Sequence, residues 1–189
     1  MRIFSSARSA AGNFSGAIRP QGSVYGIVAC KRYFKSKERM GLMKTAICYY
    51  SEHHGNTKLL LDAICKADPE VVLIDCTKRD EVDLLKYDRI GFASGIYFGA
   101  FAKQLQTFAQ INLPDKKQVF FLYTCGTMNN SYTDSIRKIA EAKEAKVLGA
   151  YCCYGFDTFE PLKIVGGIKK GHPNDEEIAG AVNFYQNLA

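Results

Sequence analysis

The segment YYSEHHGNTKLLL, residues 49–61, contains a change from a strand pattern to a helix pattern. Residues Thr45–Tyr50 form an apolar, β-prone run, and in Thr57–Ala67 the apolar residues recur at the spacing of one helical face. The residues between them are polar and end in a Gly-Asn-Thr triplet. We therefore expect a polar loop that joins the carboxyl end of a strand to the amino end of a helix.

The same alternation of apolar runs and helical patterns continues to the end of the chain. Continuous apolar runs are typical of strands buried on both faces, which occur in parallel sheets covered by helices. Five such units predict an α/β fold with a doubly wound, five-stranded parallel sheet and helices on both faces. The four further strands are predicted at Val71–Ile74, Arg89–Ser94, Gln118–Tyr123 and Val147–Tyr154.

Helical patterns follow each of these strands. The polar connection 77–87 has room for one short helix with Thr77 as its cap. Capping-box spacing occurs at Ser131 and Asp134 and again at Asn174 and Glu177. The other helices are predicted from about Phe101 to before Pro114, from about Ser131 through Ile139, and from Asn174 through Tyr185.

The charge and the cysteines exclude some classes of protein. The net charge is +6, but residues 1–42 hold eight basic residues and one acidic residue, whereas residues 43–189 hold 17 basic and 18 acidic residues. The folded part is therefore near neutral, which argues against a nucleic-acid groove. Seven cysteines without zinc-type spacing argue against a disulfide framework and for a reducing compartment.

Residues 1–42 form a separate, basic segment, rich in Ser, Gly, Ala and Arg, without sustained periodicity. We expect a disordered extension, and two origins are open: spurious upstream sequence with Met43 as the true start, or a targeting peptide for an organelle. Residues 43–189 are the expected domain. No run approaches the roughly 18 apolar residues of a membrane span, and we expect a cytoplasmic protein unless residues 1–42 direct import.

The polar loop suits an anion. The helix that follows it offers unpaired backbone N–H groups and the positive end of a dipole, and Gly55 permits close approach of the backbone. Neither the GxxxxGK pattern of nucleotide hydrolases nor the dinucleotide pattern GxGxxG is present. The loop therefore suits a single terminal phosphate held mainly by neutral donors such as Ser51, Asn56 and Thr57.

Three segments together resemble the flavodoxin family: AICYYSEHHGNT (46–57), GFASGIYFGAFAKQL (91–105) and FFLYTCGTMNNSY (120–132). The resemblance covers residues 43–189 in order. It implies a flavodoxin-like fold with strand order 2-1-3-4-5 and FMN as the cofactor. It also implies that the first segment holds the phosphate and that the loops after the third and fourth strands hold the isoalloxazine ring.

The resemblance carries over to a set of cofactor-binding residues in the three loops. Tyr97 or Phe98 is the expected stacking residue, because the loop after the fourth strand has no aromatic residue and the chain has no Trp. The expected cofactor-binding residues are Ser51, Glu52, His53, His54, Gly55, Asn56 and Thr57, then Ser94, Gly95, Ile96, Tyr97, Phe98 and Gly99, and finally Thr124, Cys125, Gly126, Thr127 and Asn129.

Other types of site are not supported. His53 and His54 are adjacent, so their side chains diverge, and no metal site is expected. Ser51 lacks the GxSxG elbow of a serine nucleophile, and no catalytic residue is expected. The insert 155–172 follows the last strand at the cofactor edge and is locally basic. It is interpreted either as a lid or docking surface or as a solvated loop.

The resemblance implies electron transfer, in which the flavin supplies the chemistry and the protein sets its position and electrostatics. We expect a flavodoxin-type shuttle between redox protein partners rather than an enzyme. The alternative is an FMN-dependent NAD(P)H:quinone or flavin reductase, with Lys163, Lys169 and Lys170 as candidates for binding the nucleotide phosphate. A second alternative is a non-redox binding module that has lost the cofactor.

Overall fold

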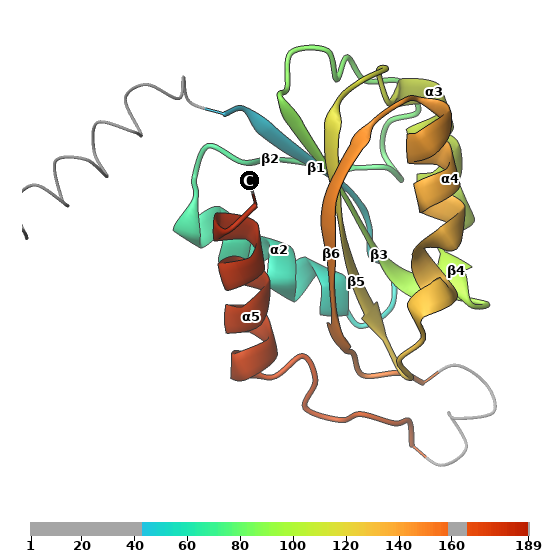
Figure 1. Cartoon of the computed structure of the whole chain (residues 1–189). Helices are drawn as coiled ribbons and strands as arrows, with labels where there is room; N and C mark the ends of the chain where they lie inside the picture. Colours follow the sequence, from blue (N-terminus) through green and yellow to red (C-terminus); the bar gives the residue numbers. More distant parts are fainter. Residues whose placement is uncertain (1–42, 159–165, 189) are drawn as a thin grey trace, which may run out of the picture. The chain divides into compact units, whose positions relative to one another are not determined.

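Five parallel strands form the centre of the domain in the computed structural model, which describes residues 43–158 and 166–188 (Figure 1). Their order across the sheet is β2-β1-β3-β5-β6, and each neighbouring pair is parallel. The predicted order 2-1-3-4-5 and the doubly wound fold are thereby confirmed. The strands are β1 (Thr45–Tyr50), β2 (Val72–Asp75), β3 (Arg89–Tyr97), β5 (Gln118–Cys125) and β6 (Lys146–Tyr154).

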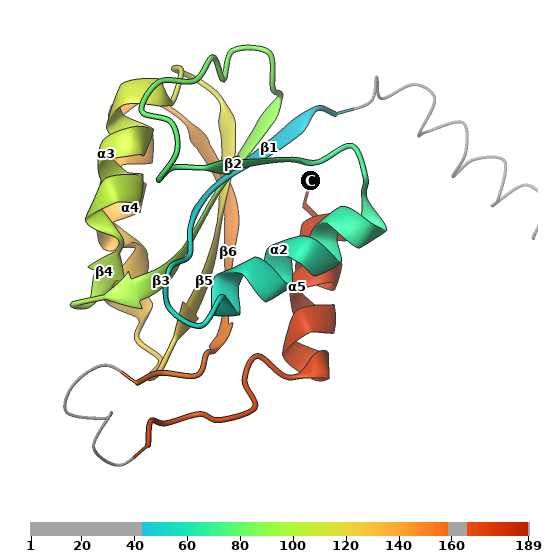
Figure 2. The ribbon, with the colours of Figure 1, turned by 180° about the vertical axis from the view of Figure 1, so that it is seen from behind.

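Helices cover both faces of this sheet. Helices α2 and α5 lie together on one face, and α3 and α4 lie on the other (Figures 1 and 2). A short 3-10 helix, η1, leads into α4. Their bounds are α2 (Asn56–Ala67), α3 (Lys103–Asn112), η1 (Asn130–Thr133), α4 (Asp134–Ala142) and α5 (Asp175–Gln186).

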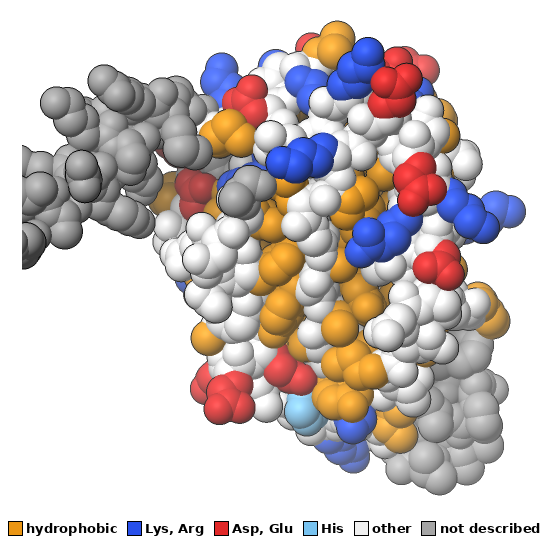
Figure 3. All heavy atoms as spheres, in the orientation of Figure 1, with side chains coloured by type: hydrophobic (Ala, Val, Ile, Leu, Met, Phe, Trp, Pro, Cys, Tyr) orange, Lys and Arg blue, Asp and Glu red, His pale blue; other side chains and the backbone are white. Residues whose placement is uncertain are grey.

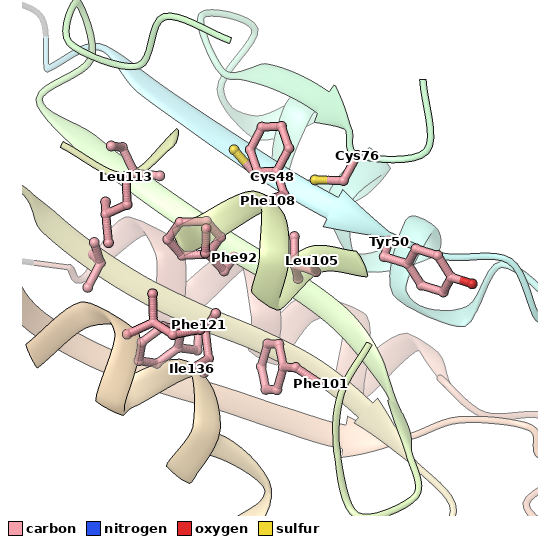
Figure 4. Close-up of a cluster of buried hydrophobic side chains, with 14 of the residues drawn as sticks. Cys48, Tyr50, Cys76, Phe92, Phe101, Leu105, Phe108, Leu113, Phe121 and Ile136 are labelled. Atoms are coloured by element: carbon pink, nitrogen blue, oxygen red, sulfur yellow. The ribbon is translucent and has the colours of Figure 1, made fainter. Parts of the chain in front are cut away.

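Adjacent phenylalanines of β5 pack on opposite faces of the sheet, because side chains alternate along a strand. Phe121 lies in the core beneath α3 and α4 with Phe92 and Ile136 (Figure 4). Phe120 lies in the core beneath α2 and α5 with Tyr185. Both phenylalanines are fully buried. Burial on both faces explains why the strands are continuous apolar runs in the sequence.

The short helix considered for residues 77–87 does not form. The Thr77 amide and hydroxyl both donate to Oδ1 of Asp75, which makes a turn at the start of the segment. Further on, distant side chains pair with the backbone. Asn112 Oδ1 accepts from an amide at 2.7 Å, and Lys117 Nζ donates to two carbonyl oxygens at 2.7 and 2.8 Å. These partners satisfy backbone groups that a helix would have paired internally.

Two further features of the secondary structure differ from the prediction. Helix α4 begins at Asp134, because Asn129 Oδ1 accepts from the Ser131 amide at 2.9 Å and starts η1 first. Strand β4 (Ala100–Phe101), which was not predicted, pairs antiparallel with the end of β3. The predictions for residues 1–42 and for Lys163 concern positions outside the described residues. Among the helices that the structure describes, none combines the length and apolar character that a membrane span needs.

The predicted capping box of α5 is present. Asn174 Oδ1 accepts from the Glu177 amide at 2.9 Å, and Glu177 Oε2 accepts from the Asn174 amide at 2.8 Å. The Glu177 carboxylate also bonds to His172 Nδ1 at 2.7 Å and to the Tyr154 amide at 3.2 Å. Burial opposes ionisation here, but the bonds to Asn174, His172 and Tyr154 outweigh it and hold the pKa of Glu177 below its ordinary value of 4.5.

We expect Glu177→Gln to reduce the free energy of unfolding by about 1 kcal/mol at pH 7, because an amide has one acceptor oxygen where the carboxylate has two. A carboxyl with a lowered folded-state pKa stabilises above its unfolded pKa, and this contribution is lost as the pH falls through the folded-state pKa. The difference from wild type should therefore shrink as the pH falls below 4.5. Urea unfolding at a series of pH values measures it.

Glu176→Gln is the matched control, since Glu176 is exposed in the same helical turn. It should leave the free energy of unfolding within about 0.5 kcal/mol of wild type. Equal effects from the two variants would show that the carboxylate of Glu177 has no special role.

Candidate functional site

A cleft of about 610 Å³ lies at the carboxyl edge of the sheet, where the loops after β1, β3, β5 and β6 meet. This edge is at the lower end of the view in Figure 1. Doubly wound sheets bind ligands at this edge, and the volume lies within the roughly 300–1,000 Å³ of small-molecule sites. The cleft is therefore large enough for a cofactor.

The loop after β1 ends in two residues with left-handed backbone conformations. His54 has φ 54° and Gly55 has φ 67°, and Gly55 is the N-cap of α2 without a side-chain cap. The first intrahelical bond runs from the Leu59 amide to the Gly55 carbonyl at 3.0 Å. The earlier amides of the helix therefore have no acceptor within α2 and, with the helix dipole, form the kind of site that binds anions.

A pair of threonine hydroxyls lies beside this helix terminus. Thr57 is 1% exposed, and its Oγ1 lies 3.0 Å from Oγ1 of Thr124 at the end of β5. Either hydroxyl can donate, and each residue also lines the cleft. The pair therefore joins the first loop to the loop after β5 and brings two neutral hydrogen-bonding groups to one place.

The segment that follows β6 packs against the loop after β1. The Asn56 side-chain amide donates to the Phe156 carbonyl at 2.7 Å, and His54 Nε2 lies 2.7 Å from Oγ1 of Thr158. The His54 and Phe156 rings are 4.6 Å apart. At Gly155, a Cβ would lie only 2.8 Å from Nδ2 of Asn56, so a larger residue there would force the Asn56 side chain to shift.

A hairpin forms another wall. Strands β3 and β4 pair through Ile96 with Phe101 and through Tyr97 with Ala100, which leaves Phe98 and Gly99 as a two-residue turn. Both turn residues have positive φ, 51° and 80°, as a type I′ turn requires. An aromatic residue in this conformation is uncommon, and Phe98 is 91% exposed at the rim of the cleft.

Tyr97 lies on the inner side of the hairpin. Its ring is 5.5 Å from the Tyr50 ring in an edge-on arrangement and 5.7 Å from the His53 ring. Burial raises the pKa of Tyr97, so the phenol stays protonated at neutral pH. Burial and the bond to Glu52 likewise raise the pKa of Tyr50 to about 12. This wall is therefore aromatic and carries no phenolate.

The loop after β5 is held close to the insert. A Cβ on Gly126 would lie 2.8 Å from Oδ2 of Asp157 and 3.1 Å from Cδ1 of Ile168. Asp157 and Ile168 exchange both backbone hydrogen bonds, at 3.1 and 2.8 Å. Thr127 Oγ1 lies 3.1 Å from the Tyr132 hydroxyl. The insert therefore contributes part of the cleft wall instead of extending only into solvent.

Most of the predicted cofactor-binding residues line this cleft. They are Ser51, His53, His54, Asn56, Thr57, Gly95, Ile96, Tyr97, Phe98, Gly99, Thr124, Cys125, Gly126 and Thr127.

Four predicted residues lie outside the lining and have other roles. Glu52 accepts from the Tyr50 hydroxyl at 2.6 Å, and Gly55 is the N-cap of α2. Ser94 is fully buried, and its hydroxyl donates to the Gly95 carbonyl and accepts from the Ala102 amide. Asn129 caps η1.

The sequence interpretation missed other lining residues. These are Tyr132, Gly155, Phe156, Asp157, Thr158 and Ile168.

His53 and His54 face different partners. His53 lies against Tyr97, and His54 lies between Phe156 and Thr158. Over residues 43–158 and 166–188, no group of three His, Cys, Asp or Glu side chains is arranged to hold a metal ion. The ring positions of the two histidines are better suited to shaping the wall and loop than to joint coordination.

Known proteins match this chain in both sequence and fold. An uncharacterized protein from Methanocaldococcus jannaschii is 32% identical over 149 residues, covering 77% of this chain and 98% of its own. The crystal structure of oxidised flavodoxin 2 from Bacillus cereus has a TM-score of 0.52 at 19% identity and covers 75% of this chain and 94% of its own.

A larger protein shares the fold in part of its length. Rubredoxin oxygen:oxidoreductase from Desulfovibrio gigas has a TM-score of 0.57 at 12% identity, and the match covers 86% of this chain but 39% of that one. The flavodoxin domain family itself matches residues 46–153, which include most of β1, all of β2 to β5 and most of β6. This protein therefore belongs to the flavodoxin domain family.

Proposed function

We propose that the cleft binds FMN and that the domain carries electrons between redox protein partners. The observation that carries this proposal is the convergence of four loops on one cleft that has the amino terminus of α2 on one side and an aromatic hairpin on another. The two sides differ in chemistry as the two ends of FMN do. One end of that cofactor is a phosphate, and the other is a flat aromatic ring.

The phosphate would lie at the amino terminus of α2. The first-turn amides, beginning at Asn56, would donate to its oxygens, and the helix dipole would favour its negative charge. The Thr57 hydroxyl would add a neutral donor, because its partner Thr124 can serve as acceptor or donor. Among the residues that the structure describes, no lysine lines the cleft. Binding would therefore depend on oriented neutral groups, each contributing about 1–3 kcal/mol toward a charged acceptor.

The ring would lie between the β3–β4 hairpin and the loop after β5. Tyr97 and Phe98 would pack against it, and the backbone at Gly95, Gly99 and Gly126 would approach its polar edge. When bound, FMN supplies the capacity to accept and donate electrons, and the protein supplies position and electrostatics. A carrier of this kind needs no general acid, base or nucleophile from the chain.

We expect Phe98→Ala to weaken the binding of FMN and of riboflavin by a similar factor, equivalent to about 1 kcal/mol, because both ligands contain the ring on which Phe98 would stack. Quenching of flavin fluorescence on titration measures both affinities. Leu59→Ala is a suitable control, since Leu59 is another exposed apolar residue and does not line the cleft. Unchanged affinity in Phe98→Ala would assign stacking to another residue.

An NAD(P)H-dependent reductase is the competing function. The locally basic insert favours it, but Lys169 Nζ lies 3.7 Å from the centre of the Tyr154 ring. That cation–π contact occupies one of the two candidate phosphate-binding lysines that lie within the described residues.

An anaerobic titration separates the alternatives. The purified full chain should show flavin absorption, should be reduced by dithionite, and should return its electrons to cytochrome c. NADPH alone should leave the absorption almost unchanged. Rapid bleaching by NADPH with turnover of a quinone would instead establish a reductase. A colourless protein that binds no added FMN would support the non-redox binding module.

A further inference from the structure

Three sulfur atoms lie together where the loop after β5 meets β6. Met128 Sδ is 3.7 Å from Cys125 Sγ and 3.6 Å from Cys152 Sγ. The three residues come from the end of β5, from the loop that follows it and from β6. None of the cysteines in the described residues forms a disulfide.

The sheet register places both cysteines of this sulfur triad on the same face. Tyr123 pairs with Cys152, and Cys125 pairs with Tyr154. Paired residues of parallel strands point the same way, and residues two apart on one strand do so as well. Cys125 and Cys152 are therefore diagonal neighbours on the α4 face, with Met128 bridging them. Diagonal neighbours on adjacent strands are about 7–8 Å apart at their Cα atoms, which is too far for an unstrained disulfide.

The triad is accessible from one side. Met128 is 45% exposed and Cys152 is half-buried, whereas Cys125 is 4% exposed. Cys152 belongs to β6, which lies at the front of the view in Figure 1. Figure 3, in the same orientation, shows a band of hydrophobic side chains at the surface between α5 and α4. Two of the three side chains, Met128 and Cys152, are therefore in contact with solvent.

The spacing of Met128 Sδ from each cysteine sulfur is compatible with coordination of one ion. With metal–sulfur bonds of about 2.3 Å, the corners of a trigonal site lie about 4 Å apart. The two Met128 distances, 3.6 and 3.7 Å, differ from this by a few tenths of an ångström. Thiolate and thioether ligands select soft cations such as Cu(I). Zinc would need a fourth ligand, and the described residues offer no group of three His, Cys, Asp or Glu side chains for a metal.

We propose that Cys125, Met128 and Cys152 form a trigonal site for one Cu(I) ion. On binding, the S–H bonds of the two cysteines break, two copper–thiolate bonds form, and both protons pass to solvent. The Met128 thioether donates a lone pair as the third ligand. Copper enters and remains as Cu(I), so no electron is exchanged. The site does not depend on the binding of FMN.

The proposal is tested with Cu(I) supplied anaerobically to the full chain in competition with a chromogenic Cu(I) chelator. Loss of an outer-shell partner alone weakens metal binding by up to about 100-fold. Cys125→Ser and Cys152→Ser each remove a direct ligand, so each should weaken Cu(I) binding by more than about 100-fold. Met128→Leu, which removes only the thioether, should weaken it about tenfold. X-ray absorption of the copper-loaded wild type should report three sulfur neighbours.

Cys65→Ser is the control, because Cys65 is a half-buried thiol on α2 outside the triad. It should leave Cu(I) affinity unchanged. An equal loss in Cys65→Ser, unchanged affinity in the triad variants, or nitrogen and oxygen neighbours at copper would overturn the proposal. If the buried position makes Cys125→Ser unfold, Cys152→Ser and Met128→Leu decide the outcome, since both side chains reach the surface.

Discussion

Replacing Phe121 by alanine is expected to reduce the free energy of unfolding by about 3–5 kcal/mol. Phe121 has no exposed surface, and its ring lies 6.2 Å from the Phe101 ring. The Arg137 guanidinium lies 5.6 Å from the centre of the Phe121 ring. Alanine would remove the ring and its contacts with both residues. It would also leave a cavity in the core beside a central strand, which the surrounding helices cannot fill completely.

Urea unfolding followed by circular dichroism measures the effect. Phe98→Ala is the matched control, because it is the same substitution at a residue that is 91% exposed. It should change the free energy of unfolding by no more than about 0.5 kcal/mol. If Phe121→Ala reduced the free energy of unfolding by less than about 1 kcal/mol, as a surface substitution does, the described packing beneath α3 and α4 would be wrong.

Replacing Thr57 by valine is expected to weaken FMN binding by about 1–3 kcal/mol, a factor of roughly 5 to 150. Valine has nearly the shape of threonine but removes the hydroxyl that lies 3.0 Å from Thr124 Oγ1. A phosphate oxygen would then lack one donor. Riboflavin has no phosphate, so its affinity should change little. Titration of each variant with both flavins gives the two affinities.

Two further variants make this result specific. Thr57→Ser keeps the hydroxyl and should retain most of the FMN affinity. Thr133→Val removes another buried threonine hydroxyl, which accepts a hydrogen bond from Arg137 Nε at 3.0 Å. Thr133 does not line the cleft, so this variant should not change the affinity for FMN. If Thr57→Val weakened both flavins equally, the hydroxyl would support the loop without contacting a phosphate.

The sheet could be predicted from the sequence because its central strands β1, β3 and β5 are buried on both faces. Phe120 and Phe121 illustrate this, since the two faces they occupy are both covered by helices. The result is a run of apolar residues that cannot be confused with a solvent-exposed strand. The capping box of Asn174 and Glu177 was equally visible, because its hydrogen bonds join residues three apart.

The elements that were missed depend on contacts between distant residues. Strand β4 has two residues, too few for any periodic pattern. The segment 77–87 is irregular because Asn112 and Lys117 pair with its backbone. The part of the cleft wall formed by Phe156 depends on a bond to Asn56, 100 residues earlier in the chain. Gly155, directly after the last strand, was the one local signal of that close approach.

The measurement that tests the central claim most directly is a titration of the flavin-free full chain with FMN and, separately, with riboflavin. If the amino terminus of α2 and the Thr57–Thr124 pair hold the phosphate, FMN should bind at least about tenfold more tightly than riboflavin, which corresponds to about 1.4 kcal/mol. Equal affinities for the two flavins, or no binding of either, would contradict the assignment of this cleft as an FMN site.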